Sequence, residues 1–323
     1  MPEFDRNWLY FLVPCTLYLY TFAPMKVAIY GRAFNPSIPG RQKSLADSTA
    51  AALQTLLRKL EKEGVEVLLY EPLLASIGKA KVKDTFTKHE EIKGKVKFLF
   101  SIGGDGTFLE TVTLVRNSGI PVVGINTGRL GFLSSISTDE IAPAVDSLLK
   151  GHYSLDKRTL LELEIQGKYF LECRYALNEI TVQKTDSSSM ITIHASINGK
   201  LLNSYWADGL IVATPTGSTA YSLSCGGPIV MPYSENFVVT PIAPHNLNIR
   251  PVIISSEDTV LLEMEGRSPH FLVSLDSHSE NVKSPVSLSI KKADFLFSLV
   301  NLEKQDFLLK LRNKLNWGLD KRN

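Results

Sequence analysis

The sequence predicts a protein of two folded domains, a parallel α/β domain followed by an antiparallel β-sandwich domain. Strand and helix patterns alternate from residue 25 to about residue 137, whereas short strand patterns follow one another from residue 138 to residue 300. The chain of 323 residues is 44% hydrophobic, which is ample for two cores. We therefore expect an α/β plus all-β fold, with domains at 25–137 and 138–300.

The α/β domain is expected to hold a parallel sheet with helices on its faces. Apolar, β-branched runs predict its strands, and an Ala- and Leu-rich amphipathic stretch predicts its longest helix. The expected strands are residues 27–30, 65–70, 96–102 and 121–126, and the expected helices are residues 44–62 and 109–116. This order is Rossmann-like, and ligands bind such sheets at the carboxyl ends of their strands.

The rhythm changes after a helix expected at residues 139–149. Short strands at near-regular spacing are typical of an antiparallel sandwich, and Asn198-Gly199 is typical of a two-residue hairpin turn. The expected strands are residues 160–165, 169–174, 179–183, 191–197, 200–205, 252–255, 260–264, 271–275 and 286–290. Apolar positions at helical spacing predict a last helix at residues 307–315.

The most informative stretch is SIGGDGTF, at residues 101–108, between an expected strand and an expected helix. Its glycines let a phosphate approach the backbone N–H groups, and a helix N-terminus attracts anions. A carboxylate such as Asp105 is unfavourable beside phosphates and better suited to a hydroxyl group or a metal ion. A phosphoryl-transfer enzyme can use such a loop. The alternative is an ordinary glycine-rich turn whose Asp bonds its own backbone.

A second motif, DGLIVATPTGSTAYSLS, occupies residues 208–224 and is followed by Gly226-Gly227-Pro228. It begins as a strand and continues into small hydroxyl residues with a single aromatic side chain, Tyr221. Hydroxyl groups, main-chain donors and one stacking ring at close spacing suit a nucleoside. This motif favours the catalytic interpretation of Asp105.

With both motifs present, the chain resembles the NAD kinase family. The GGDGT loop alone also occurs in diacylglycerol, sphingosine and phosphofructokinase relatives, but its pairing with LNEI and the long second motif is specific to NAD kinases. The resemblance extends from Met25 to the C-terminus. It implies that the tail, about 301–323, folds back onto the domain at 25–137. Its further blocks are NTGRLGFL at 126–133, Pro244-His245, Arg250-Pro251, and LNEI itself at 177–180.

The resemblance implies transfer of a phosphoryl group from ATP, or another phosphate donor, to the adenosine 2′-hydroxyl of NAD. Asp105 would be the general base, and Gly106 would let the substrate pass close to the backbone. A divalent ion, Mg²⁺ or similar, would be held mainly by the phosphates of the donor. The sequence contains no visible metal cage made of protein ligands alone.

The resemblance also implies a dinucleotide site. Asn178 and Glu179 would bind the adenosine portion, and Asp208 would accept from the nicotinamide amide. The remaining residues expected to line the site are Thr219, Ala220, Tyr221, Ser222, Leu223, Ser224 and Ala243.

Three positions depart from the family pattern. Glu110 stands where many relatives have a basic residue or His, and Trp206 where some relatives carry a basic residue. Asp276-Ser277-His278 replaces the commoner D-G-Q, which leaves the role of His278 open. None of these changes affects the proposed base.

The composition limits the partners. With 35 basic and 33 acidic residues, nothing in the chain indicates nucleic acid or an acidic membrane surface as a partner. The 3 cysteines lack C-x-x-C spacing and fit a reducing cytoplasm rather than disulfides or zinc. The six histidines show no i, i+4 ligand pair. The family resemblance leans to a homo-oligomer.

Residues 1–24 form an extension that we expect to be a gene-start artefact, with translation beginning at Met25. The apolar stretch at 8–22 is interrupted by Pro14, is short for a membrane span and lacks a signal-peptide cleavage site. A membrane anchor is the alternative. A chain that begins at Met25 should therefore be folded and active.

Two rival functions remain open. A lipid kinase with the same loop would leave the nucleoside motif unexplained. A non-catalytic NAD(H) sensor would have no need for Asp105. The sequence alone leaves open the choice between ATP and polyphosphate, the acceptance of NADH and the identity of any regulator.

Overall fold

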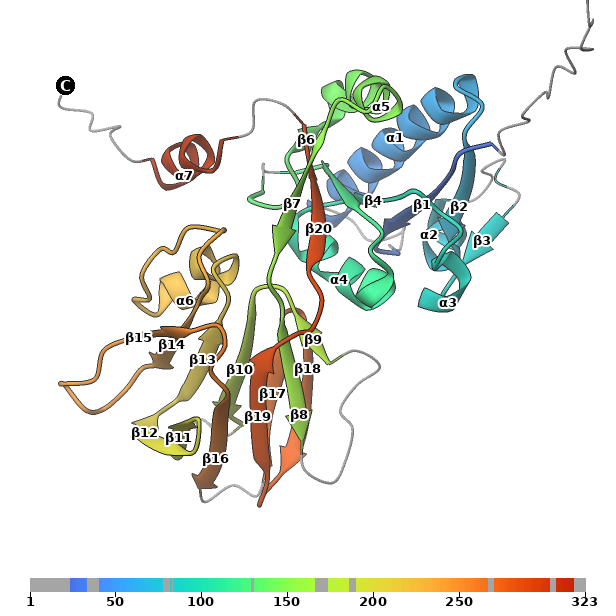
Figure 1. Cartoon of the computed structure of the whole chain (residues 1–323). Coiled ribbons are helices and arrows are strands. Elements are labelled where there is room, and N and C mark those ends of the chain that lie inside the picture. The colour runs from blue at the N-terminus through green and yellow to red at the C-terminus, as the bar shows by residue number, and fades with distance from the viewer. Residues whose placement is uncertain are drawn as a thin grey trace, which may run out of the picture.

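The computed structural model describes residues 24–33, 41–77, 82, 84–128, 131–165, 174–185, 190–266, 270–302 and 306–316. An α/β part with a parallel sheet is joined to a part built of antiparallel sheets, and a helix lies near the C-terminus (Figure 1). This arrangement confirms the expected fold class. Residues 1–23, most of the strand expected at 169–174 and part of the NTGRLGFL block lie outside the described residues.

The first sheet has the strand order β3-β2-β1-β4-β5-β20-β7, and β6 pairs with β5. Strands β3, β2, β1, β4, β5 and β20 run parallel to their neighbours, and β7 is an antiparallel edge strand. Its strands are β1 (Lys26–Gly31), β2 (Glu66–Tyr70), β3 (Asp84–Phe86), β4 (Phe98–Ile102), β5 (Val122–Asn126), β6 (Ile136–Ser137), β7 (Ser154–Arg158) and β20 (Phe297–Asn301).

Helices cover both faces of this sheet. One core joins β1 and β4 to α1 and α5 through residues such as Leu53, Leu56 and Val145, and the other joins them to α3 and α4 through Ile92 and Phe108. The helices are α1 (Arg41–Lys62), α2 (Glu71–Ile77), α3 (His89–Ile92), α4 (Asp105–Val115) and α5 (Ile141–Leu149).

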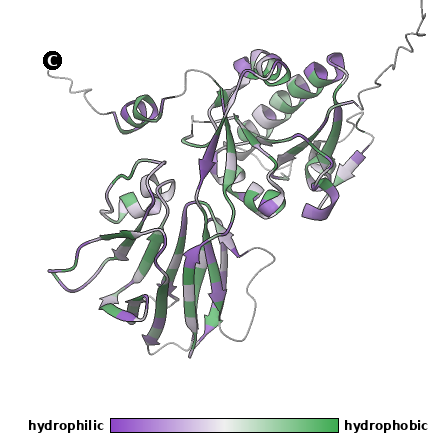
Figure 2. Ribbon diagram, in the orientation of Figure 1, coloured by the Kyte–Doolittle hydropathy of each residue, from purple (hydrophilic) through white to green (hydrophobic). Residues whose placement is uncertain are grey.

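Strands β7 and β20 come from the second half of the sequence. They pair with each other, and Leu299 of β20 lies beside Val122 of β5. The domain expected at 138–300 includes almost all of both segments, but their hydrogen bonds place them in the first sheet. The exact domain boundaries stay a prediction. The edge strand β7 is strongly hydrophilic (Figure 2), and charged side chains on an edge discourage pairing with other chains.

The second part consists of two six-stranded sheets, with the orders β15-β14-β13-β10-β17-β18 and β12-β11-β16-β19-β8-β9. A core that includes Val182, Ile193, Phe237 and Phe271 joins the two sheets. The strands are β8 (Leu161–Ile165), β9 (Tyr175–Ala176), β10 (Glu179–Lys184), β11 (Ile191–Ile197), β12 (Lys200–Ala207), β13 (Gly209–Ala213), β14 (Asn236–Ile242), β15 (Val252–Ser255), β16 (Val260–Gly266), β17 (His270–Leu275), β18 (His278–Lys283) and β19 (Ser287–Lys292). The short helix α6 (Tyr221–Ser224) follows β13.

The C-terminal helix α7 (Phe307–Leu315) packs against the first domain, as expected. The rings of Phe307 and Phe132 are 6.4 Å apart, and the Lys314 ammonium lies 4.8 Å from the centre of the Phe132 ring. Asp306 caps the helix by accepting from the Leu308 N–H at 3.0 Å. Among the described residues, no helix is long and apolar enough to cross a membrane.

Candidate active site

Asp105 is the first residue of α4 and links two loops. Its Oδ2 accepts from the Phe132 N–H at 2.7 Å, and its Oδ1 accepts from Leu133 and Ser134 at 3.1 and 2.9 Å. Gly131 permits this approach, because a Cβ atom at that position would overlap the carboxylate. The NTGRLGFL block therefore includes a loop whose backbone is held by Asp105.

The clamp leaves room for one further hydrogen bond at Asp105. A carboxylate offers about four lone-pair positions, two on each oxygen. Oδ1 accepts two of the backbone bonds and Oδ2 accepts one. The remaining position on Oδ2 can accept a hydroxyl proton from a substrate.

The backbone around Asp105 is shaped for an anion. Gly104 is the N-cap of α4, so the unpaired N–H groups and positive dipole end of that helix lie at the glycine-rich loop. A Cβ atom on Gly103 would overlap Thr107, which explains glycine there. The loop also follows β4, and thus lies at the carboxyl end of a parallel strand, as the sequence predicts.

Arg32 is a residue that the sequence analysis missed. Its guanidinium pairs with Glu110 through Nε at 2.8 Å and Nη2 at 2.6 Å, and Nη2 also approaches the Gly106 carbonyl oxygen at 3.4 Å. Tyr30 donates to the same Glu110 carboxylate at 2.6 Å, and burial together with Glu110 raises the Tyr30 pKa. Glu110, a departure from the family pattern, thus holds a cation beside the loop.

A second carboxylate clamp lies at Asn178 and Glu179. Asp276 accepts from the N–H groups of Leu177, Asn178 and Glu179 at 2.7, 2.9 and 3.0 Å. Leu177 packs in the same core as Phe108 of α4, so this turn lies against the helix that Asp105 begins. The structure therefore brings Asn178 and Glu179 to the junction with the first domain. The family pattern D-G-Q marks the position of Asp276 but not its partners, which are about a hundred positions away.

The side chain of Glu179 is an acid held in a poorly solvated place. Its carboxyl group accepts from the Tyr221 N–H, and its Oε2 has no hydrogen-bond partner among the described residues. Burial, reinforced by the nearby charge of Asp276, raises the pKa of Glu179 to about 8. At neutral pH the group is therefore mostly protonated and can donate a hydrogen bond as well as accept one.

Several hydroxyl groups of the second motif form hydrogen bonds within the protein. Thr214 donates to the Leu177 carbonyl oxygen at 2.6 Å, and Ser218 donates to the Pro215 carbonyl oxygen at 2.7 Å. The Ser222 hydroxyl is fully buried and shares a hydrogen bond with Thr240 at 2.8 Å. The hydroxyl groups of Thr214, Ser218 and Ser222 are therefore bonded within the protein, in contrast to the interpretation of every small hydroxyl of the motif as a ligand group. Ser222 is buried as a whole residue, and its place in the dinucleotide site stays a prediction.

Other predicted residues of this segment are accessible. Tyr221 is exposed, and Gln183 donates to its hydroxyl at 3.3 Å. Gly217 allows close packing on Asn178, because a Cβ atom there would overlap the Asn178 carbonyl group. The predicted residues with side chains that are partly or fully accessible are Thr219, Ala220, Tyr221, Leu223 and Ser224.

Asp208 lies at the far end of the same sheet. Its carboxylate pairs with Lys184 at 2.6 Å, and its N–H donates to the Ile242 carbonyl oxygen at 3.0 Å, next to the exposed Ala243. Strand β10 connects the two ends, with Glu179 at its start and Lys184 at its end. Five residues of strand span about 17 Å, so the candidate site is elongated. Asp208 and Ala243 are thus brought together, well separated from Glu179.

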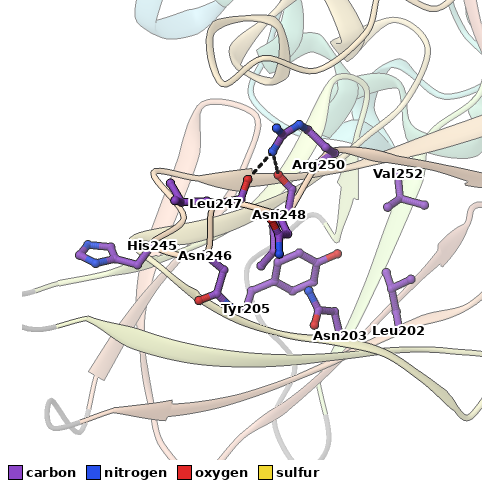
Figure 3. A pocket seen from close by; sticks show the side chains of 10 residues that line it. Leu202, Asn203, Tyr205, His245, Asn246, Leu247, Asn248, Arg250 and Val252 are labelled. Atoms are coloured by element: carbon purple, nitrogen blue, oxygen red, sulfur yellow. Dashed lines mark hydrogen bonds between the residues drawn. The ribbon is translucent and has the colours of Figure 1, made fainter.

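A hollow of about 820 Å³ lies beyond Ala243, between β12 and the loop that follows β14 (Figure 3). Its lining includes Tyr205, His245 and Arg250, and the Arg250 guanidinium holds the loop by donating to the carbonyl oxygens of Leu247 and Ile249. None of the predicted site residues lines it. The hollow is therefore separate from the residues around Asp105.

A glycine-rich loop that opens a helix, a carboxylate poised in it and a β-sandwich that contributes a second set of polar groups together define a two-domain phosphotransferase that acts on nucleotides. Residues 42–153 match the model of the ATP-NAD kinase N-terminal domain, and residues 177–302 match that of the ATP-NAD kinase C-terminal domain. The chain belongs to the NAD kinase family.

Curated relatives and solved structures agree with this assignment. A NAD kinase of Cytophaga hutchinsonii is 46% identical over 304 residues, covering 93% of this chain and 100% of that protein, and one of Bacteroides fragilis is 43% identical over 303 residues, covering 92% and 100%. An Archaeoglobus fulgidus NAD kinase in complex with ATP has a TM-score of 0.68 at 26% identity, covering 90% of this chain and 99% of that one. The fold is also that of yeast NADH kinase complexed with NADH, with a TM-score of 0.78 at 24% identity, covering 93% and 90%.

Proposed function

We propose that this enzyme phosphorylates the adenosine 2′-hydroxyl of NAD and that Asp105 is the general base. The observation that carries the proposal is the free lone-pair position on Oδ2 at the N-terminus of α4. In the transfer, the 2′-oxygen forms a bond to the terminal phosphorus of ATP while the bond from that phosphorus to its bridging oxygen breaks. The electron pair leaves with ADP, and the hydroxyl proton passes to Asp105.

The dinucleotide lies along β10 in this proposal. Asn178, Glu179 and Tyr221 bind the adenosine end, close to the core shared by Leu177 and Phe108. Asp208 and Ala243 bind the nicotinamide end. The length of the strand between the two groups supports this orientation, because a dinucleotide is itself elongated. The neutral Glu179 carboxyl group can donate to a ribose oxygen as well as accept from a ribose hydroxyl.

The described residues contain no group of three or more His, Cys, Asp or Glu side chains suited to hold a metal ion. Three of the lone-pair positions of Asp105 are also engaged by backbone N–H groups. In this proposal a divalent ion would be held mainly by the phosphates of the donor. Such an ion supplies neutralisation of the phosphate charge.

The deciding experiment mixes the purified full-length protein with NAD, ATP and magnesium and measures NADP. NADP formation is the expected result. NAD binding without NADP, with ATP and then with polyphosphate as the donor, would contradict the proposal and favour an NAD(H) sensor. Replacing NAD by NADH in the same assay tests the acceptor. The homo-oligomer stays a prediction from the family resemblance, and the cytoplasmic location stays a prediction from the cysteine content.

A further inference from the structure

Lys310 lies on the face of helix α7 that packs against the rest of the protein. Its residues Phe307, Lys310, Leu311, Lys314 and Leu315 are partly or fully buried, whereas those at 308–309 and 312–313 are exposed. This i, i+3, i+4, i+7, i+8 spacing is one face of a helix. Lys310 therefore lies on the inward face, where a lysine is uncommon unless it has a partner.

The inward face rests on the loop that Asp105 holds. Phe307 and Lys314 both contact the Phe132 ring, and Lys310 lies between them along the helix face. The N–H of the same Phe132 donates to Asp105 at 2.7 Å. Lys310 is thus directed toward the neighbourhood of the candidate base.

A second cation, Arg158, lies at the end of the edge strand β7. The residue is only 7% exposed, with Nη1 donating to Thr216 at 3.2 Å and Nη2 paired with Asp156 at 2.5 Å. Its Nε is buried and has no hydrogen-bond partner among the described residues. A buried charged donor without an acceptor is costly, so the position suits an anion that arrives from outside.

Lys310 and Arg158 act on each other electrostatically. Burial, followed by repulsion from Arg158, lowers the pKa of Lys310 to about 8, with a smaller repulsion from Lys314 and opposing attraction from Asp156 and Asp105. Two cations that repel in a poorly solvated place are both stabilised when an anion binds between them. Figure 1 shows α7 on the side of the first sheet that β7 forms.

We propose that Lys310 and Arg158 bind the terminal phosphate groups of the phosphate donor beside Asp105. Because it is a donor subsite, this role depends on the proposed kinase function. Lys310 donates N–H bonds to phosphate oxygens and Arg158 supplies its free Nε–H, and neither residue forms a covalent bond. Positive groups that meet the charge of the transferring phosphoryl group favour the transition state.

The test measures binding of inorganic tripolyphosphate to the full-length protein at pH 7 by calorimetry, without NAD. Lys310→Met is expected to weaken binding about tenfold, and Lys310→Arg to retain most of it. Arg312→Met removes one positive charge from the outer face of the same helix and should leave binding unchanged. Equal affinities for Lys310→Met and Arg312→Met would overturn the proposal.

Kinetics provide a second readout. Lys310→Met should raise the KM for ATP or lower kcat while the KM for NAD stays the same. Lys310 is charged below its pKa, so the activity that depends on it should decline above about pH 8 in the wild type and persist to higher pH in Lys310→Arg. The charged groups facing Lys310 in this range are Asp105, Asp156, Arg158 and Lys314. A Lys310→Arg profile identical to that of the wild type would count against the role.

The experiments distinguish failure of the proposed kinase function from failure of the proposed phosphate site at Lys310. If the wild type makes no NADP but binds tripolyphosphate through Lys310, the kinase function is wrong and the anion site stands. If the wild type makes NADP and Lys310→Met binds tripolyphosphate normally, only the role of Lys310 is wrong. Arg158 is buried, and its replacement would also affect folding, so the lysine variants carry the test.

Discussion

Asp276 and Glu179 are joined by two hydrogen bonds, one to the Asp276 side chain and one between their backbones. The Asp276 carboxylate accepts from the Glu179 N–H at 3.0 Å, and the Asp276 N–H donates to the Glu179 carbonyl oxygen at 3.1 Å. Asp276 also adopts a positive φ of 52°, which is unfavourable for a residue other than glycine. Asp276 thus holds the backbone of Leu177, Asn178 and Glu179, the segment that we propose binds the adenosine end of NAD.

Replacing Asp276 with Asn should lower stability and weaken NAD binding. An amide has one acceptor oxygen and would turn an NH₂ group toward at least one of the three N–H donors. We expect a loss of about 1–3 kcal/mol in the free energy of unfolding and a raised KM for NAD. Chemical denaturation and steady-state kinetics measure both. Ser274→Ala, on the strand β17 that ends just before Asp276, removes a hydrogen bond to Ser279 and is the control, which should change neither quantity.

Replacing Asp105 with Asn should lower kcat by about 10²–10⁴ and should also lower Tm. The three backbone bonds to Phe132, Leu133 and Ser134 give Asp105 a structural role beside its proposed role as the base, and Asn can accept fewer of them. Gly131→Ala displaces the carboxylate without removing it, so it measures how strongly Tm and kcat depend on the position of this group. Near-normal turnover of Asp105→Asn at a temperature where it is folded would exclude the base.

Replacing Asp208 with Ala should raise the KM for NAD with little change in kcat. Its proposed partner is the nicotinamide amide, remote from the reacting hydroxyl, so the lost interaction is similar in the ground and transition states. Lys184→Met is the matched control, because it breaks the same 2.6 Å ion pair but leaves the carboxylate. A KM increase of equal size in both variants would mean that the ion pair, rather than a contact with NAD, matters.

Glu179→Gln should become more stable relative to the wild type as pH rises from about 4.5 to 8. The pKa of Glu179 is raised to about 8 in the folded state, so the folded protein holds more protons than the unfolded chain in this window. Wild-type stability that depends on this group is therefore full at low pH and is lost with rising pH. Thermal melts at pH 5 and pH 8 should show a Tm difference that grows by several degrees. A constant difference would mean that Glu179 ionises normally.

The sequence predicts what is local. An apolar strand followed by glycines and a helix is enough to locate the loop around Asp105, and helical spacing is enough to predict α7. The resemblance adds Asn178, Glu179 and Asp208. These patterns do not show which groups far apart in the sequence lie close together in space. The contacts of Asp276 with the backbone at 177–179 and the position of Lys310 near Asp105 were therefore found only in the structure.

Strand pairing between segments far apart in the sequence explains why β7 and β20 were expected in the sandwich and are found in the first sheet. The hydrophilic segment of β7 has no buried face that would mark it as part of the first sheet, and its partner β20 lies about 140 positions away. Short strands after residue 138 all look alike in sequence. Only hydrogen-bond register assigns two of them to the parallel sheet.

Because β7 and β20 belong to the first sheet, this sheet cannot be completed early in translation. A nascent chain emerges from its N-terminus, and early domains usually fold before later ones are made. Here the first sheet lacks its last two strands until Asn301 has been synthesised. While the sandwich is translated, the outer edge of β5 is therefore paired with β6 at Ile125 and Asn126 but lacks its partner β20 at Val122. We expect ribosome-bound chains that end before β20 to be more sensitive to protease in β5 than those that include it.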